Sequence, residues 1–107
     1  MNKLRYSPDA LNDLDEIWAY IHKELQNPSA AQKTVAEILD STERLRTFSE
    51  MEPLLSTIME VESDYRFLAS GNYIVFYRIE GAFVSVDRIL YGRPDFIRVL
   101  FHALPED

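Results

Sequence analysis

The spacing of apolar residues changes once along this 107-residue chain, near Tyr65, and that change restricts the folds it can adopt. Before Tyr65, apolar residues recur every three or four positions, as they do on one face of a helix. After it, aromatic and β-branched residues form short runs separated by turn residues, as they do in strands. The sequence therefore predicts an α+β architecture with helices first and strands second.

The first half predicts two helices joined by a tight turn. Ser7-Pro8-Asp9 offers an N-cap residue, a proline for the first helical position and an acid at the positive end of the helix dipole. An apolar stripe then runs to about Gln26 through Leu11, Leu14, Ile17, Trp18, Ile21 and Leu25. Asn27-Pro28 repeats the start signal, and a second stripe follows through Ala31, Val35, Ile38, Leu39, Thr42, Leu45 and Phe48. We expect a short strand at residues 3–6, followed by an antiparallel helical hairpin with both stripes buried.

The second half predicts a three-stranded antiparallel meander over residues 65–69, 73–79 and 82–90. The central run 73–77 is apolar on both faces, so we expect the helices to cover one face and another partner the other. Beyond Gly92, the residues Phe96, Ile97, Leu100 and Phe101 have helix-like spacing, which also fits a short docked tail. The predicted fold is a single domain, 1–107, in which a short N-terminal strand and a helical hairpin pack on an antiparallel β-meander.

Composition excludes several classes of function. The chain has no cysteine and only two histidines, His22 and His102, so we expect no metal, and we place both histidines at the surface. Its three glycines do not form a phosphate-binding loop, and we expect no cofactor. It has no apolar run long enough to span a membrane and no secretion signal, so we expect a cytoplasmic protein.

The formal net charge of −7 is unevenly distributed. Residues 1–62 carry a balance of −6, whereas residues 63–98 carry +1 and contain five arginines: Arg66, Arg78, Arg88, Arg93 and Arg98. The acidic total disfavours nucleic acid, although a local arginine patch could oppose it. Each arginine can contact a ligand or balance a nearby acid. We interpret the acidic cluster Asp13, Asp15 and Glu16 as solvated helix residues.

Arginines and tyrosines are concentrated on the predicted strands and just beyond them. The set consists of Tyr65, Arg66, Tyr73, Tyr77, Arg88, Tyr91 and Arg93. Such side chains could cut RNA or hold an acidic peptide. Because side chains alternate between the two faces of a strand, not all of them can converge.

The ordered elements resemble the RelE/ParE toxins of bacterial type II toxin-antitoxin systems over about residues 3–98. The resemblance is carried by Tyr6-Ser7-Pro8-Asp9-Ala10, Leu14-Asp15-Glu16-Ile17, Asp64-Tyr65-Arg66-Phe67-Leu68, Gly71 to Ile79 and Val86 to Asp95. It implies a growth-inhibiting toxin, associated with plasmid stabilisation, that a cognate antitoxin neutralises by wrapping around it.

The resemblance leaves two targets open. Toxins of the RelE branch cut mRNA in the ribosomal A site, and the likeness implies that Arg66 and Arg93 contact phosphate while Tyr91 acts as an acid or base. Ile74 stands where that branch commonly has an arginine, and the late tyrosine is absent. The ParE branch binds DNA gyrase without catalytic residues and is more similar at residues 89–95. Under either reading Tyr65, Tyr73, Tyr77 and Arg88 are predicted binding residues; an inactive interaction domain is the third alternative.

Overall fold

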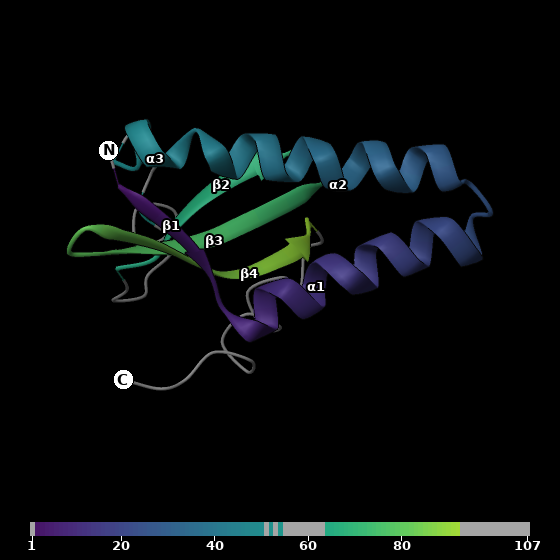
Figure 1. The fold of residues 1–107 in the computed structure, drawn as a ribbon, viewed down its shortest axis with the longest axis horizontal. Helices are drawn as coiled ribbons and strands as arrows, with labels where there is room; N and C mark the ends of the chain where they lie inside the picture. Colours follow the sequence, from purple (N-terminus) through teal and green to yellow (C-terminus); the bar gives the residue numbers. More distant parts are fainter. Residues whose placement is uncertain (1, 51, 53, 55–63, 93–107) are drawn as a thin grey trace.

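The computed structural model describes residues 2–50, 52, 54 and 64–92, which form a four-stranded sheet packed against helices (Figure 1). The elements in chain order are β1 (Lys3–Tyr6), α1 (Pro8–Ala19), the π-helical segment η1 (Tyr20–Glu24), α2 (Pro28–Glu43), α3 (Leu45–Phe48), β2 (Arg66–Ser70), β3 (Tyr73–Glu80) and β4 (Phe83–Tyr91). The predicted strand, helical hairpin and meander are thus confirmed. The expected segment around Phe96 to Phe101 lies outside the described residues, as does His102.

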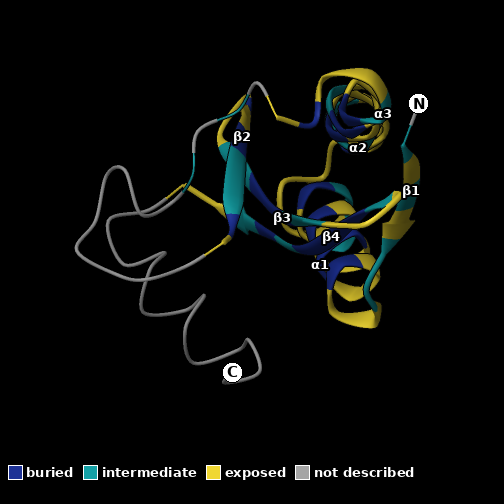
Figure 2. Cartoon of the chain, turned by 90° about the vertical axis from the view of Figure 1, so that its left-hand side faces the viewer, coloured by how far each residue is buried: buried dark blue, intermediate teal, exposed yellow. Residues whose placement is uncertain are grey.

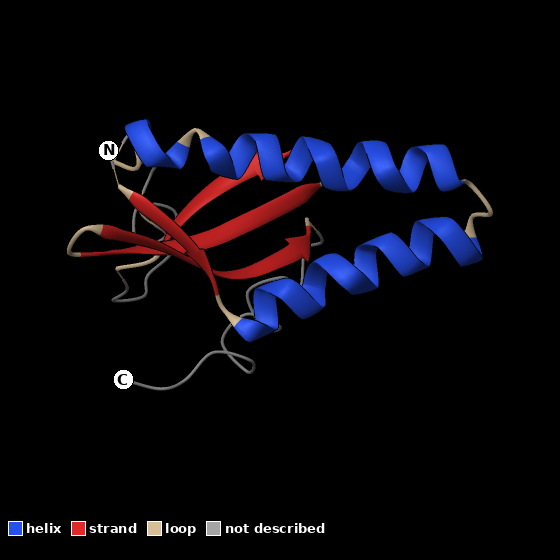
Figure 3. Ribbon diagram, in the orientation of Figure 1, coloured by secondary structure: helices blue, strands red, loops and turns tan. Residues whose placement is uncertain are grey.

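Both helices begin as their sequence signals predict. The Ser7 hydroxyl accepts a hydrogen bond from the backbone N–H of Ala10 at 3.0 Å, and the Asn27 side chain accepts one from the N–H of Ala30 at 3.1 Å. A proline follows each cap, where its missing N–H costs nothing because the first helical N–H groups have no intrahelical partner. These two caps determine where each helix of the hairpin begins, and the turn between the helices lies at the right of Figure 3.

The strands are ordered β1-β4-β3-β2 in the sheet. β2, β3 and β4 form the predicted antiparallel meander, and β1 pairs with β4 in parallel, with Leu4 opposite Val84. A parallel neighbour needs a long crossover, which the helical hairpin and the first two meander strands supply. The first and last described strands are therefore neighbours although about 80 residues separate them in the chain.

One core cluster joins the helices to the sheet. Ala10, Leu14 and Ile17 of α1 and Ala31 and Ile38 of α2 pack against Val75, Tyr77, Val84, Val86 and Ile89. Figure 2 shows buried positions on the inner sides of the helices and on the strands. Phe76 lies outside this cluster, and alternation places it on the opposite face, yet it is also fully buried. At Phe76 the central strand is therefore buried on both faces, and the expectation that a partner covers the second face stays a prediction.

The buried apolar stripes of the two helices are narrower than predicted. Leu11, Trp18 and Leu25 are 51%, 40% and 57% exposed, and Leu39 and Phe48 are exposed too. Adjacent residues of a helix lie about 100° apart around its axis, so Leu11 and Trp18 point well away from the buried Ala10 and Ile17. The Trp18 ring instead stacks on His22 with centroids 4.4 Å apart, and His22, predicted at the surface, is half-buried.

Candidate functional site

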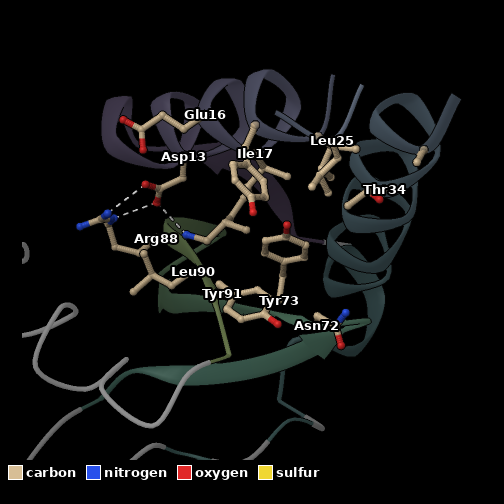
Figure 4. Close-up of a pocket in the computed structure, with 14 residues that line it drawn as sticks. Asp13, Glu16, Ile17, Leu25, Thr34, Asn72, Tyr73, Arg88, Leu90 and Tyr91 are labelled. Carbon is tan, nitrogen blue, oxygen red and sulfur yellow. Dashed lines mark hydrogen bonds and ion pairs between the residues drawn. The ribbon is translucent and has the colours of Figure 1, made fainter. Parts of the chain in front are cut away.

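The two helices extend beyond the ends of the strands (Figure 3). Residues of the helices and of the strand ends line a groove of about 930 Å³ (Figure 4). We call it the Tyr91 groove. Its apolar helical wall consists of Ile17, Tyr20, Ile21, Leu25, Ala30 and the methyl-bearing Thr34. Its sheet wall consists of Asn72, Tyr73, Arg88, Ile89, Leu90 and Tyr91, and Asp13 and Glu16 lie at one end. The helical hairpin and the last strand thus form a single surface.

The π-helical segment η1 shapes the helical wall. The N–H of Leu25 bonds to the carbonyl of Tyr20 at 3.2 Å, a contact five residues apart instead of four. In a regular α-helix Tyr20 and Leu25 would lie about 140° apart around the axis. A hydrogen bond between residues five apart brings them closer to one side, and both line the groove.

The free edge of β4 positions the start of α1. β1 ends with Tyr6 opposite Val86, so the rest of β4 has no β1 partner. A register shift places Phe76 opposite Arg88 but Tyr77 opposite Val86, which leaves Asp87 as an extra, bulged residue. The Ser7 hydroxyl donates a hydrogen bond to the Asp87 carbonyl at 2.8 Å. The N-cap residue of α1 therefore also supplies a donor to the backbone carbonyl of the bulged residue.

Asp13 fastens α1 to the same edge further along. Its carboxylate accepts from Arg88 Nε at 2.8 Å, from Arg88 Nη2 at 2.9 Å and from the backbone N–H of Ile89 at 2.8 Å (dashed lines in Figure 4). The Asp13 and Arg88 side chains are only 6% and 13% exposed. The hydrogen bonds that Arg88 donates to Asp13 raise the pKa of Arg88, and the charges of Asp13, Asp9 and Glu16 raise it further. Arg88 does lie at the site, but its guanidinium is held by Asp13.

The expectation that Asp13 is solvated was wrong. It lies among Ala10, Leu14 and Ile17 on the inner face of α1, where it is buried and ion-paired. An acid at that position in an apolar stripe is a signal that sequence reading could have used, because a buried carboxylate needs a partner.

Tyr73 and Tyr91, both predicted binding or catalytic residues, meet in the groove. Their rings pack edge to face with centroids 5.7 Å apart. Burial raises the pKa of Tyr73, and the neighbouring phenols of Tyr91 and Tyr20 raise it further. Tyr20, Leu25 and Tyr91 are 54%, 57% and 52% exposed, so three large, mainly apolar side chains face solvent around one groove. Such a surface is suited to binding an apolar segment of another molecule.

Tyr65 and Tyr77, both predicted as binding residues, are buried and do not line this groove. Tyr77 is fully buried, and its hydroxyl donates to the carbonyl of Ser49 at 2.7 Å. Burial raises its pKa to about 12. Tyr65 is 6% exposed and lies beneath the guanidinium of Arg78, 4.8 Å from its ring centroid. Both tyrosines therefore contribute to packing within the domain.

Arg66 and Tyr91, two of the three predicted catalytic residues, lie far apart. Arg66 pairs with Tyr77 and Tyr91 with Tyr73, so they are separated by four residues along β3, about 14 Å, and by two strand spacings. Arg66 Nη1 donates to the carbonyls of Glu52 at 2.7 Å and Glu50 at 3.3 Å, which anchors the chain after α3. Arg93, the third residue, lies outside the described residues.

In the part of the chain that the structure describes, no helix is long and apolar enough to cross a membrane. The described residues also contain no group of three or more histidine, aspartate and glutamate side chains arranged to hold a metal ion.

Comparison with known proteins identifies the family. Residues 4–96 match the family model described as the ParE toxin of the type II toxin-antitoxin system parDE. A structure of the chromosomal ParDE system from P. aeruginosa contains a chain with a TM-score of 0.74 at 23% identity, over 87% of this chain and 98% of that one. The isolated E. coli RelE toxin gives a TM-score of 0.47 at 15% identity, over 97% and 100% of the two chains. A sequence search of curated proteins found no significant match. Because the family model spans most of the sequence, and the fold agrees with it, the chain belongs to the ParE toxin family and is the toxin component of a type II toxin-antitoxin system.

Proposed function

We propose that this toxin arrests growth by binding a protein target, DNA gyrase, and that its cognate antitoxin neutralises it by occupying the Tyr91 groove. The observation that carries the proposal is the exposure of Tyr20, Leu25 and Tyr91 around that groove. Exposed apolar side chains gathered in one place favour association with another polypeptide. The toxin acts in the cytoplasm, and a plasmid that carries the pair would be stabilised.

Binding is favoured over RNA cleavage by the placement of the candidate groups. An acid or base must reach the reacting atoms directly or through one water molecule. Arg66 and Tyr91 lie too far apart to act on one phosphate, and Arg66 is occupied by two backbone carbonyls. The guanidinium of Arg88 is held by Asp13. Among the described residues, these groups do not support a shared catalytic centre.

Expression of the chain without its antitoxin tests the target. Growth, the integrity of mRNA and the supercoiling of a reporter plasmid are followed together after induction. We expect growth arrest with intact mRNA and relaxed plasmid, together with SOS induction. Cleaved mRNA with normal supercoiling would instead identify a ribosome-dependent nuclease, and unimpaired growth would identify an inactive interaction domain.

A matched pair of variants tests the groove. Tyr91 and Phe48 are both 52% exposed, but only Tyr91 lines the groove. The antitoxin used is the product of the reading frame that adjoins this gene. Truncation of a central aromatic contact costs at least about ten-fold in affinity, so Tyr91→Ala should weaken the complex by that factor and Phe48→Ala by less than about two-fold. Equal effects would place the antitoxin elsewhere.

A further inference from the structure

The Tyr91 groove is chemically different at its two ends. Figure 4 shows Glu16, Asp13 and Arg88 on one side and Tyr73, Tyr91 and Leu25 on the other. The side with the tyrosines offers aromatic rings and aliphatic side chains. The opposite side, which we call the acidic end, offers charged groups. A segment that lies in the groove therefore contacts charged groups at one end and apolar groups at the other.

The acidic end carries excess negative charge. Three carboxylates, those of Asp13, Asp9 and Glu16, act on the single guanidinium of Arg88. The Asp13 carboxylate accepts both direct bonds from that guanidinium, so the negative charge of Asp13 is compensated by Arg88. Glu16 accepts only a neutral hydrogen bond, from Asn12 Nδ2 at 3.1 Å, and neither Glu16 nor Asp9 is ion-paired with any other residue in the described part of the chain. Both are exposed and remain available to a ligand.

We propose that the antitoxin segment held in the Tyr91 groove carries a lysine or arginine that meets Glu16 at the acidic end, and aliphatic side chains along the tyrosines. This inference rests on the proposed function, because it specifies the partner of the same groove. Charge complementarity supports it, since Arg88, the cationic residue of the groove wall, is already neutralised by Asp13. A second copy of this chain is a poorer occupant because it would bring another formal charge of −7.

Selection from random 12-residue peptides displayed on phage tests the inference with the full chain as bait. We expect enriched peptides to combine aliphatic residues three or four positions apart with a basic residue near one end. Their binding should be lost with Tyr91→Ala. Enrichment of neutral or acidic peptides, failure to enrich any peptide, or binding unaffected by Tyr91→Ala would each overturn the inference.

The contribution of Glu16 is then measured with the best peptide by fluorescence anisotropy. Glu16→Gln should weaken binding by about two- to five-fold at low ionic strength, and the loss should shrink as added salt screens the pair. Glu37→Gln, a change at an exposed position of α2 outside the groove, is the matched control and should leave affinity unchanged. Replacing the basic residue of the peptide by glutamine should cost the same factor and remove the effect of Glu16→Gln. Equal affinities of Glu16→Gln and Glu37→Gln would overturn the inference.

Two outcomes separate this inference from the proposed function. If Tyr91→Ala abolishes binding of the adjoining-gene antitoxin while Glu16→Gln has no effect, the antitoxin does occupy the Tyr91 groove, but it has no basic residue that meets Glu16. If neither variant affects the antitoxin, both fail. A reversible dimer of the chain alone that disappears with Tyr91→Ala would assign the groove to a second copy and also overturn the inference.

Discussion

Replacing Asp13 by alanine should lower the free energy of unfolding by about 3–5 kcal/mol, the range found when one partner of a buried ion pair is removed. The variant loses two hydrogen bonds from Arg88 and one from the N–H of Ile89. Because both charged side chains are at most 13% exposed, solvent screens the pair little. The nearby charges of Asp9 and Glu16 stabilise the remaining guanidinium, so we expect a value near the lower end of that range.

Urea unfolding followed by circular dichroism measures this loss, and a thermal scan should show a fall in Tm of more than about 12 °C. Asp15→Ala is the matched control, since Asp15 is an exposed acid on the same helix. That control should change the free energy of unfolding by less than about 0.5 kcal/mol. A loss of less than about 1 kcal/mol for Asp13→Ala would refute the reasoning.

A double replacement separates the charge from the backbone contact. Asp13→Leu with Arg88→Met removes both charges, so it should be less damaging than Asp13→Ala alone. It still leaves the N–H of Ile89 without its acceptor, which costs about 1–3 kcal/mol. A double variant as stable as the original chain would show that the carboxylate is not needed to satisfy the edge of β4.

Three further predictions concern single residues. Because the pKa of Tyr77 is raised from 10.0 to about 12, the folded state keeps a proton that the unfolded state loses, so stability should fall as pH rises from about 10 to 12. Tyr77→Phe should reduce that slope in urea titrations and cost about 1 kcal/mol at neutral pH. Arg66→Ala should cost about 1–2 kcal/mol by denaturant unfolding, yet leave growth arrest unchanged per folded molecule; loss of arrest in a stable variant would revive a catalytic role. Gly92→Ala should lower stability by about 1 kcal/mol in the same assay, since its Cβ would lie 3.3 Å from the Asn72 carbonyl; an unchanged Tm would refute this close approach.

Local signals in the sequence predicted the elements because those signals act over a few residues. The caps at Ser7 and Asn27, with the prolines that follow them, determine where the helices begin. Gly71 and Gly81 adopt positive φ values of 58° and 60° in the two turns that separate the strands, a conformation that favours glycine. The order of helices and strands, and hence the family, could be predicted from such signals.

The site depends on tertiary contacts that local signals do not encode. Tyr77 and Tyr91 look alike as aromatic residues of neighbouring strands, but Tyr77 faces the core beneath the helices, while Tyr91 lies where the groove opens. The π-helical hydrogen bond that brings Tyr20 and Leu25 toward the groove has no distinctive residue pattern. The bulge at Asp87 changes the register just before Arg88, so alternation alone could not predict its bond to Asp13.

The central claim, that this toxin acts by binding and not by cutting RNA, is tested most directly with purified components. The protein is added in increasing amounts to a gyrase supercoiling reaction and, in parallel, to a translating ribosome extract. We predict that supercoiling falls with toxin concentration, that a molar excess of the adjoining-gene antitoxin restores it, and that the mRNA stays intact. Supercoiling that persists at excess toxin, together with mRNA cleavage in the ribosomal A site, would contradict the account.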